Sequence, residues 1–180
     1  EYCPDLLTTA INFTATPGGT TATFNWTNSN AAIGLPSSGT GNIAPFNATN
    51  ANTMALSGTF LVHATFNGCT GPDSSFVITV NPKPNALFLA DTNICEGDPM
   101  NFTSTSTVGS GSVTGWNWDM DNDGNYNNSS AANPPYTFSS AGTHTVGLIA
   151  VSDKGCRDTT HQTVYVNYQP VPDFMGDNLL

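Results

Sequence analysis

Three aspartates recur at every second position in the stretch WNWDMDNDGN. They are Asp119, Asp121 and Asp123, and Gly124 follows where a chain can bend sharply. Alternating carboxylates with a glycine at the bend can direct their oxygens onto one point, as loops that bind hard cations do. The spacing therefore predicts a Ca²⁺ site to which Asn125 adds its backbone carbonyl.

Two other interpretations of these aspartates remain open. The carboxylates can accept hydrogen bonds from nearby backbone amides, as in Asx turns. A catalytic pair is disfavoured, because acids of one loop lack the facing arrangement and buried setting that glycoside hydrolysis requires. A helix–loop–helix calcium site is excluded, since Ser130 stands where that loop needs a bidentate glutamate, so water or another loop must complete any cage.

No catalytic motif accompanies the aspartates. The three histidines, His63, His144 and His161, show neither H-x-H nor H-E-x-x-H spacing. The sequence also has no G-x-S-x-G elbow and no P-loop. We therefore predict a protein that is not an enzyme.

The composition excludes several classes of partner. Three Lys and Arg residues stand against thirteen Asp and Glu residues, and the net charge of −10 would repel nucleic acid and anionic membrane surfaces. Polar coverage comes instead from Thr, Ser and Asn, which is typical of an extracellular chain. No run of eighteen apolar residues occurs, so we expect no membrane insertion. A first residue other than Met and the lack of a signal peptide indicate a piece of a longer protein.

One sequence unit occurs twice. Val80, Pro84 and Phe88 each have an identical residue 86 positions later, and "NGC" at 67–69 matches "KGC" at 154–156. Within each copy, apolar residues alternate as in half-buried strands, and Gly, Asn, Asp and Pro clusters separate short β-rich segments. About eighty-five residues of this kind predict an all-β fold of two tandem immunoglobulin-like β-sandwiches. We assign them to 1–83 and 84–168, joined by a short proline-containing linker, and expect a further repeat to start in 169–180.

Four cysteines, Cys3, Cys69, Cys95 and Cys156, lack the C-x-x-C spacing of zinc or redox sites. Their wide spacing in a chain of secreted character predicts two disulfides. We expect the bonds Cys3–Cys69 and Cys95–Cys156, because each would run from the first strand of a copy to its late hairpin. Bonds that cross from one copy to the other are the alternative.

The tryptophans lie in aromatic pairs at strand spacing. Phe24 with Trp26, and Trp116 with Trp118, are two positions apart and should point the same way into a core. A sugar-stacking platform, as in a carbohydrate-binding module, is the alternative.

The second copy resembles a PKD (polycystic kidney disease) domain over residues 84–168. The resemblance rests on "ICEGDPMNFTSTST", "GWNWDMDNDGN", "NPPYTFSSAGTHTVGLIAVSDKGCRDT" and the closing "TVYVN". The first copy lacks the aspartate turn and is similar to the PKD-like companion modules in large surface proteins of gliding bacteria.

This resemblance implies a repeated spacer or ligand-presenting module of a secreted or cell-surface protein, such as an adhesin exported by type IX secretion in Bacteroidota. The implied partners are neighbouring repeats, surface polysaccharide or other proteins, and further copies in a homopolymer. An accessory carbohydrate-binding or spacer module of a secreted hydrolase and a subunit of an extracellular filament are the alternatives. "DTT" at 158–160 is similar to the O-glycosylation triplet of such proteins, which makes Thr159 a candidate glycan site.

Overall fold

The computed structural model describes residues 1–172, which form an all-β fold with one 3-10 helix, η1 (Ala31–Ile33), and no α-helix. In this part of the chain no helix is long and apolar enough to cross a membrane. The strands are β1 (Thr23–Asn28), β2 (Ser38–Thr40), β3 (Leu56–Phe66), β4 (Cys69–Thr70), β5 (Ser74–Val80), β6 (Phe88–Ala90), β7 (Pro99–Ser104), β8 (Val113–Asp119), β9 (Pro135–Thr137), β10 (Gly142–Ser152) and β11 (Arg157–Val166).

The chain divides into two compact units. Unit 1 contains Glu1–Asn85 together with two loops, Thr107–Thr114 and Val151–Asp158, and unit 2 contains the remainder. These two loops therefore group with unit 1, whereas the sequence placed them in 84–168. They pair with each other, because the Asp153 amide donates to the Ser112 carbonyl over 2.8 Å. Of the expected further repeat in 169–180, residues 173–180 lie outside the described residues.

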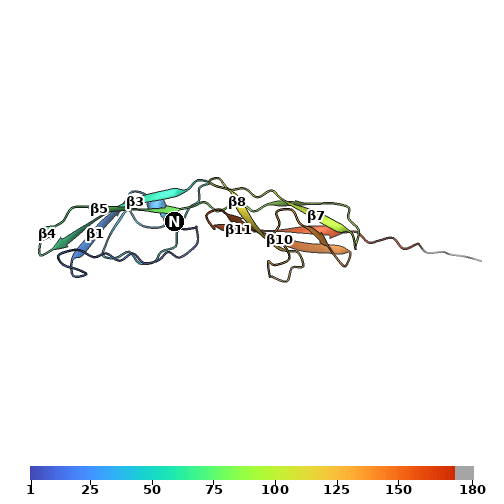
Figure 1. Ribbon diagram of the computed structural model, residues 1–180, viewed down its shortest axis with the longest axis horizontal. Coiled ribbons are helices and arrows are strands. Elements are labelled where there is room, and N and C mark those ends of the chain that lie inside the picture. The colour runs from blue at the N-terminus through green and yellow to red at the C-terminus, as the bar shows by residue number, and fades with distance from the viewer. Residues whose placement is uncertain (173–180) are drawn as a thin grey trace, which may run out of the picture. The chain divides into compact units, whose positions relative to one another are not determined.

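Unit 1 is built on β3, which pairs antiparallel with β1 on one side and β5 on the other (Figure 1). The opposite layer consists of extended segments held by the bridges Leu7–Asn47 and Ile11–Ile43. Phe60 and Ile43 are both fully buried in the core between these layers. Unit 1 thus has the two layers of a β-sandwich, although only one of them is a regular sheet.

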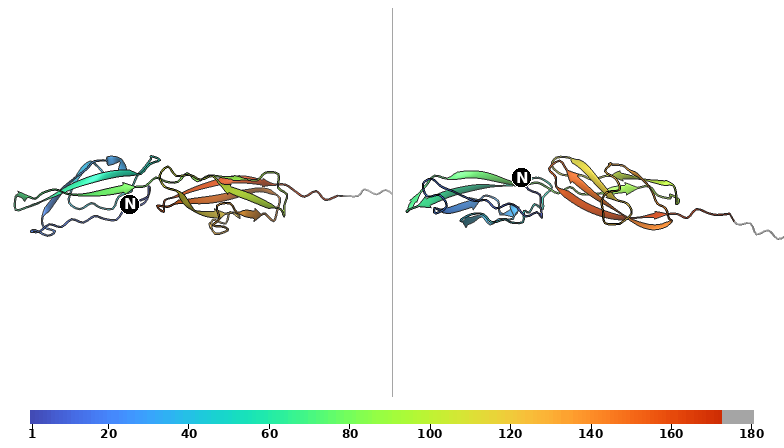
Figure 2. Two further views of the ribbon diagram at one scale, coloured as in Figure 1. Left: turned by 45° about the horizontal axis from the view of Figure 1, so that its top comes forward. Right: turned by 60° about the horizontal axis from the view of Figure 1, so that its bottom comes forward.

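Unit 2 packs two three-stranded sheets face to face. One sheet has the order β11-β10-β8 and the other β6-β7-β9. The two longest strands of the first sheet run side by side in orange to red in Figure 2. Phe102 of β7 and Trp118 of β8 meet in the core with ring centroids 5.7 Å apart. This arrangement is an immunoglobulin-like β-sandwich.

The sequence repeat is visible in the strand order. β3 and β10 are both eleven residues long and lie between equivalent neighbours, β5 and β1 in the first copy and β11 and β8 in the second. The predicted alternation is confirmed, because Phe60 and Val62 are buried while Leu61 between them is 45% exposed. In β10 the inward residues Val146, Leu148 and Ala150 are fully buried.

The tryptophan of unit 1 lies against a strand that has no side chain at the point of contact. Gly39 of β2 pairs with Trp26 of β1, and a Cβ atom on Gly39 would lie 2.1 Å from Cζ2 of the Trp26 indole. A carbon atom cannot approach a ring this closely, so the packing requires glycine at this position. Strand β2 therefore has glycine at the position that lies against the Trp26 indole.

We predict that Gly39→Ala lowers the free energy of unfolding by about 1–3 kcal/mol, the usual cost of overpacking. Gly71→Ala is the matched control, because a Cβ there meets only the Ala64 carbonyl oxygen at an ordinary 3.6 Å. Urea unfolding followed by tryptophan fluorescence measures both variants. Equal stability of the two would show that Trp26 does not depend on the bare backbone of β2.

Candidate functional site

The aspartate loop begins where β8 leaves the core of unit 2. Trp118 is fully buried, and Asp119, the last residue of β8, is only 2% exposed. The Asp119 carboxylate accepts hydrogen bonds from the backbone amides of Asp123 (3.2 Å) and Gly124 (3.1 Å), one on each oxygen. A buried charge of this kind is stable because amides that point at it replace its lost hydration.

A second aspartate braces the tip of the same loop. Asp123 accepts from the Asn125 backbone amide over 2.7 Å and from the Asn125 side-chain amide over 3.0 Å. These two hydrogen bonds, the side-chain one first, lower the pKa of Asp123 below its ordinary value. Asn122 and Gly124 have positive φ angles of 56° and 85°, which fold the chain back toward β8. The loop therefore contains the carboxylate–amide hydrogen bonds that the Asx-turn interpretation predicts.

The three carboxylates also converge. One oxygen from each of Asp119, Asp121 and Asp123 lies within 4.8 Å of the others. Calcium–oxygen distances are about 2.3–2.6 Å, so two ligands of one ion can lie up to about 5 Å apart. The fourth expected ligand, the Asn125 carbonyl, accepts from the Asn127 amide over 2.9 Å and keeps a second lone pair. The donor set and its spacing thus fit a hard cation.

Two tyrosines that the sequence analysis did not include lie in the field of this cluster. Burial, and secondly the charge of Asp119, raises the pKa of Tyr126. Burial, and then the charges of Asp121 and Asp119, raises the pKa of Tyr136. Tyr126 directly follows the aspartate motif, so its place near the aspartates could have been predicted. Tyr136 belongs to β9, and no local sequence pattern indicated that it lies near them.

The three histidines have different partners. His63 lies 3.4 Å from Asp73, His144 contacts the Ser140 carbonyl at 2.9 Å, and His161 hydrogen-bonds Tyr126 Oη at 2.8 Å. Within residues 1–172, the aspartate trio is the one group of three His, Cys, Asp or Glu side chains placed to share a metal ion. The aspartate trio is therefore the candidate cation site.

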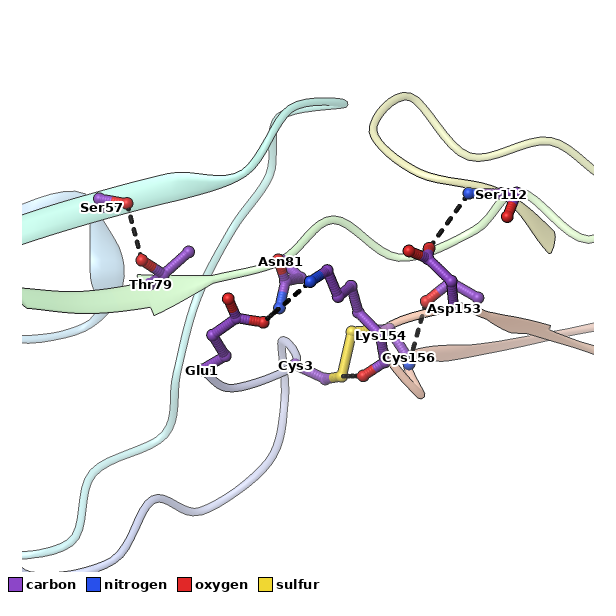
Figure 3. A network of polar contacts seen from close by, with 10 residues as sticks. Glu1, Cys3, Ser57, Thr79, Asn81, Ser112, Asp153, Lys154 and Cys156 are labelled. Atoms are coloured by element: carbon purple, nitrogen blue, oxygen red, sulfur yellow. Dashed lines mark hydrogen bonds and ion pairs between the residues drawn. A yellow bond between two sulfur atoms is a disulfide. The ribbon is translucent and has the colours of Figure 1, made fainter. Parts of the chain in front are cut away.

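The expected disulfide pairing is wrong. Among the described residues there is one disulfide, Cys3–Cys156, which joins residues 153 positions apart (Figure 3). Cys69 and Cys95 are free. Closing a loop of that length stabilises the folded chain by roughly 5 kcal/mol on the chain-entropy model. The bond lies within unit 1, because unit 1 includes the loop that carries Cys156.

Strand length explains why the expected bonds do not form. Cys3 follows Tyr2, which bridges Val80 beside the Leu56 end of β3, whereas Cys69 pairs with Phe66 at the other end. Ten residues of strand separate those ends by about 33 Å, and disulfide Cα atoms must lie within about 7 Å. In the second copy, β11 likewise separates Cys156 at its start from Cys95 at its end, where Cys95 bridges Asn167.

Polar contacts surround the observed bond. Lys154 Nζ lies 3.5 Å from Glu1 Oε2, and the Asn81 side-chain amide donates to the same oxygen over 3.3 Å (Figure 3). The Asn81 hydrogen bond, followed by the charge of Lys154, lowers the pKa of Glu1. The loop that carries Cys156 is therefore held to the N-terminal segment by an ion pair as well as by the disulfide.

The tryptophans and Thr159 are the remaining candidate site residues. Trp26 and Trp118 are buried and Trp116 is half-buried, so the tryptophans pack in the cores as expected and form no exposed stacking platform. Thr159 is exposed on β11.

The second copy matches a known protein family. Residues 81–168 match the PKD domain. The matched segment includes the aspartate loop, Cys95 and Cys156. PKD domains are non-catalytic modules.

Three solved structures are similar to the chain. The PKD1 domain of Vibrio anguillarum Epp is 28% identical, with 48% of this chain and 96% of that chain covered and a TM-score of 0.42. The PKD1 domain of the Vibrio cholerae metalloprotease PrtV is 28% identical, with 47% and 98% covered and a TM-score of 0.41. The fibronectin(III)-like modules of Clostridium thermocellum CbhA are 12% identical, with 98% and 94% covered and a TM-score of 0.46. No curated protein matches the sequence.

We predict that Tyr126 ionises above the usual range of tyrosine, and that Asp119→Asn brings its pKa down by removing the neighbouring negative charge. Because the pKa is raised on folding, the stability linked to Tyr126 is complete below the unfolded pKa and is lost as the pH rises through the folded value. Phenolate absorbance measures the titration, and Tyr126→Phe identifies which step belongs to Tyr126.

Asp123→Asn is the matched control, since it neutralises a carboxylate of the same loop and leaves Asp119 charged. An unchanged Tyr126 titration in Asp119→Asn would mean that the carboxylate does not influence the phenol.

Proposed function

We propose that this chain is a non-enzymatic structural and adhesive segment of a long extracellular surface protein, serving as a stalk or an adhesin array. The observation that carries the proposal is the duplication. Two copies of one sequence unit adopt the same strand order, β5-β3-β1 and β11-β10-β8, and the second matches a non-catalytic module family. A repeated module without a catalytic set is suited to spanning distance and presenting surface.

The surface chemistry supports an extracellular setting. A disulfide forms and persists in oxidising compartments outside the cytosol, and PKD domains are typically extracellular. The net charge of −10 disfavours binding to nucleic acid. We propose neighbouring repeats, surface polysaccharide or surface proteins as the partners, a Bacteroidota-type cell surface as the setting, and Thr159 as a glycan site. Assembly into a homopolymer is part of the same hypothesis.

Antibodies raised against this chain should label intact, unpermeabilised cells of the source organism, and brief protease treatment of those cells should remove the label. Immunogold electron microscopy measures both, with an antibody to a cytosolic protein as the control for leakage. Signal confined to the culture supernatant, together with a hydrolase activity that the antibody depletes, would contradict the proposal and favour an accessory module of a secreted enzyme.

We further propose that Ca²⁺ binds Asp119, Asp121, Asp123 and the Asn125 carbonyl and stiffens unit 2. Three converging carboxylates repel one another, and a divalent cation between them removes that repulsion. Asp121 is exposed, so its substitution tests the ligand set while the backbone bonds of buried Asp119 stay in place.

We expect saturating Ca²⁺ to raise the melting temperature of unit 2, because a ligand at 100 times its Kd stabilises the folded state by about 2.7 kcal/mol. Asp121→Asn should abolish the shift and Asp98→Asn, an exposed acid outside the loop, should retain it. Calorimetry with Ca²⁺ and with a chelator measures the effect. A shift of equal size in both variants would assign it to general charge screening.

A further inference from the structure

The two free cysteines occupy the same structural positions as the two bonded ones. The Asn81 amide donates to the Tyr2 carbonyl over 2.9 Å, and the Asn167 amide donates to the Ile94 carbonyl over 2.8 Å. The residue after Tyr2 is Cys3, and the residue after Ile94 is Cys95. Cys3 and Cys95 are therefore equivalent, each beside the end of the last strand of its copy, and we call them first-strand cysteines.

The other two cysteines are equivalent in the same way. Cys69 follows β3, and Cys156 follows β10, the two eleven-residue central strands. Each is preceded by a glycine with a positive φ angle, 79° at Gly68 and 78° at Gly155. We call Cys69 and Cys156 hairpin cysteines.

The observed bond follows a rule that these positions define. It joins the first-strand cysteine of one copy, Cys3, to the hairpin cysteine of the next copy along the chain, Cys156. Strand length prevents a bond within one copy, since both copies hold their two cysteines at opposite ends of long strands. Cys95 is a first-strand cysteine with no later copy among residues 1–172, and Cys69 is a hairpin cysteine with no earlier one.

We infer that Cys95 forms a disulfide with the hairpin cysteine of a following repeat, and that Cys69 forms one with the first-strand cysteine of a preceding repeat. Each repeat is then crosslinked to the next by the same bond as Cys3–Cys156. This inference rests on the proposed role as a tandem array. The partner of Cys95 is a repeat of the kind described here whose hairpin cysteine is a free thiol.

The chemistry requires a disulfide oxidant, for which we name a thiol–disulfide oxidoreductase. The Cys95 thiolate attacks the oxidant's disulfide, whose S–S bond breaks to give a mixed disulfide and one free thiol on the oxidant. The hairpin thiolate of the next repeat then attacks Cys95 Sγ and displaces the oxidant's second thiol. Two protein thiols are oxidised to one disulfide, and the two electrons and two protons leave on the oxidant, which is reduced to a dithiol.

The test is a double chain in which two full-length chains are fused end to end. In the first version the leading chain carries Cys69→Ser and the trailing chain carries Cys95→Ser, so that only the leading Cys95 and the trailing Cys69 are free. We expect an oxidoreductase with a glutathione redox pair to reduce the count of free thiols from two per molecule to none. Mass spectrometry of unreduced peptides should find the Cys95–Cys69 bond.

The matched control exchanges the substitutions, so that the leading Cys69 and the trailing Cys95 remain and have no partner under the rule. Two thiols should persist there, and Cys3–Cys156 in both chains of each version reports correct folding. Persistence of both thiols in the first version, or their loss in both versions, overturns the inference. Neither result bears on surface labelling of cells, so the proposed function can stand while this inference fails.

A second arm distinguishes repeats of one polypeptide from separate molecules. Unfused Cys69→Ser and Cys95→Ser chains are mixed under the same oxidising conditions and run on non-reducing gels. A disulfide-linked dimer formed only in the mixture assigns the bond to separate copies as well. Bond formation only in the double chain assigns it to successive repeats of one polypeptide.

Discussion

The fixed rise of an extended strand is the constraint on which the rest of this molecule depends. β3 and β10 each run eleven residues without interruption, so each sheet has two ends about 33 Å apart. The terminal segment and the end of the last strand meet at one end, and the hairpin lies at the other. The two cysteines of one copy therefore cannot form a disulfide with each other, and only a cysteine of another repeat can be the partner. Core residues such as Phe60 and Leu148 fill the length between.

The two copies cover the tryptophan of their central sheet with different second layers. In unit 1, isolated bridges hold the second layer together, and Gly39 lies against the indole of Trp26, whose buried N–H has no hydrogen-bond partner. In unit 2, the Trp118 indole donates to the Ala131 carbonyl over 2.8 Å, and its backbone pairs with Ser129. The aspartate loop is the segment that brings these acceptors back to β8. Its carboxylates thus shape the core as well as a candidate cation site.

Much of this arrangement could be predicted from residue patterns, because alternation reports the face of a strand directly. The inward residues of β3 and β10, the buried tryptophans and the convergence of the aspartates follow from spacing alone. The cysteine pairing did not, since spacing along the chain does not show which end of a sheet a residue reaches. For the same reason no residue pattern indicated that Tyr136 lies near the aspartates, or that the loop carrying Asp153 groups with unit 1.

The span of the Cys3–Cys156 bond has a consequence for resistance to proteolysis. Every peptide bond from Cys3 to Cys156 lies inside the closed covalent loop, including those of the proline-containing linker. A single proteolytic nick anywhere in that region leaves both fragments attached through sulfur. Within this region a piece is lost only after two cuts, and one cut separates the chain only if the disulfide is also reduced, so covalent continuity between Cys3 and Cys156 does not depend on an intact backbone.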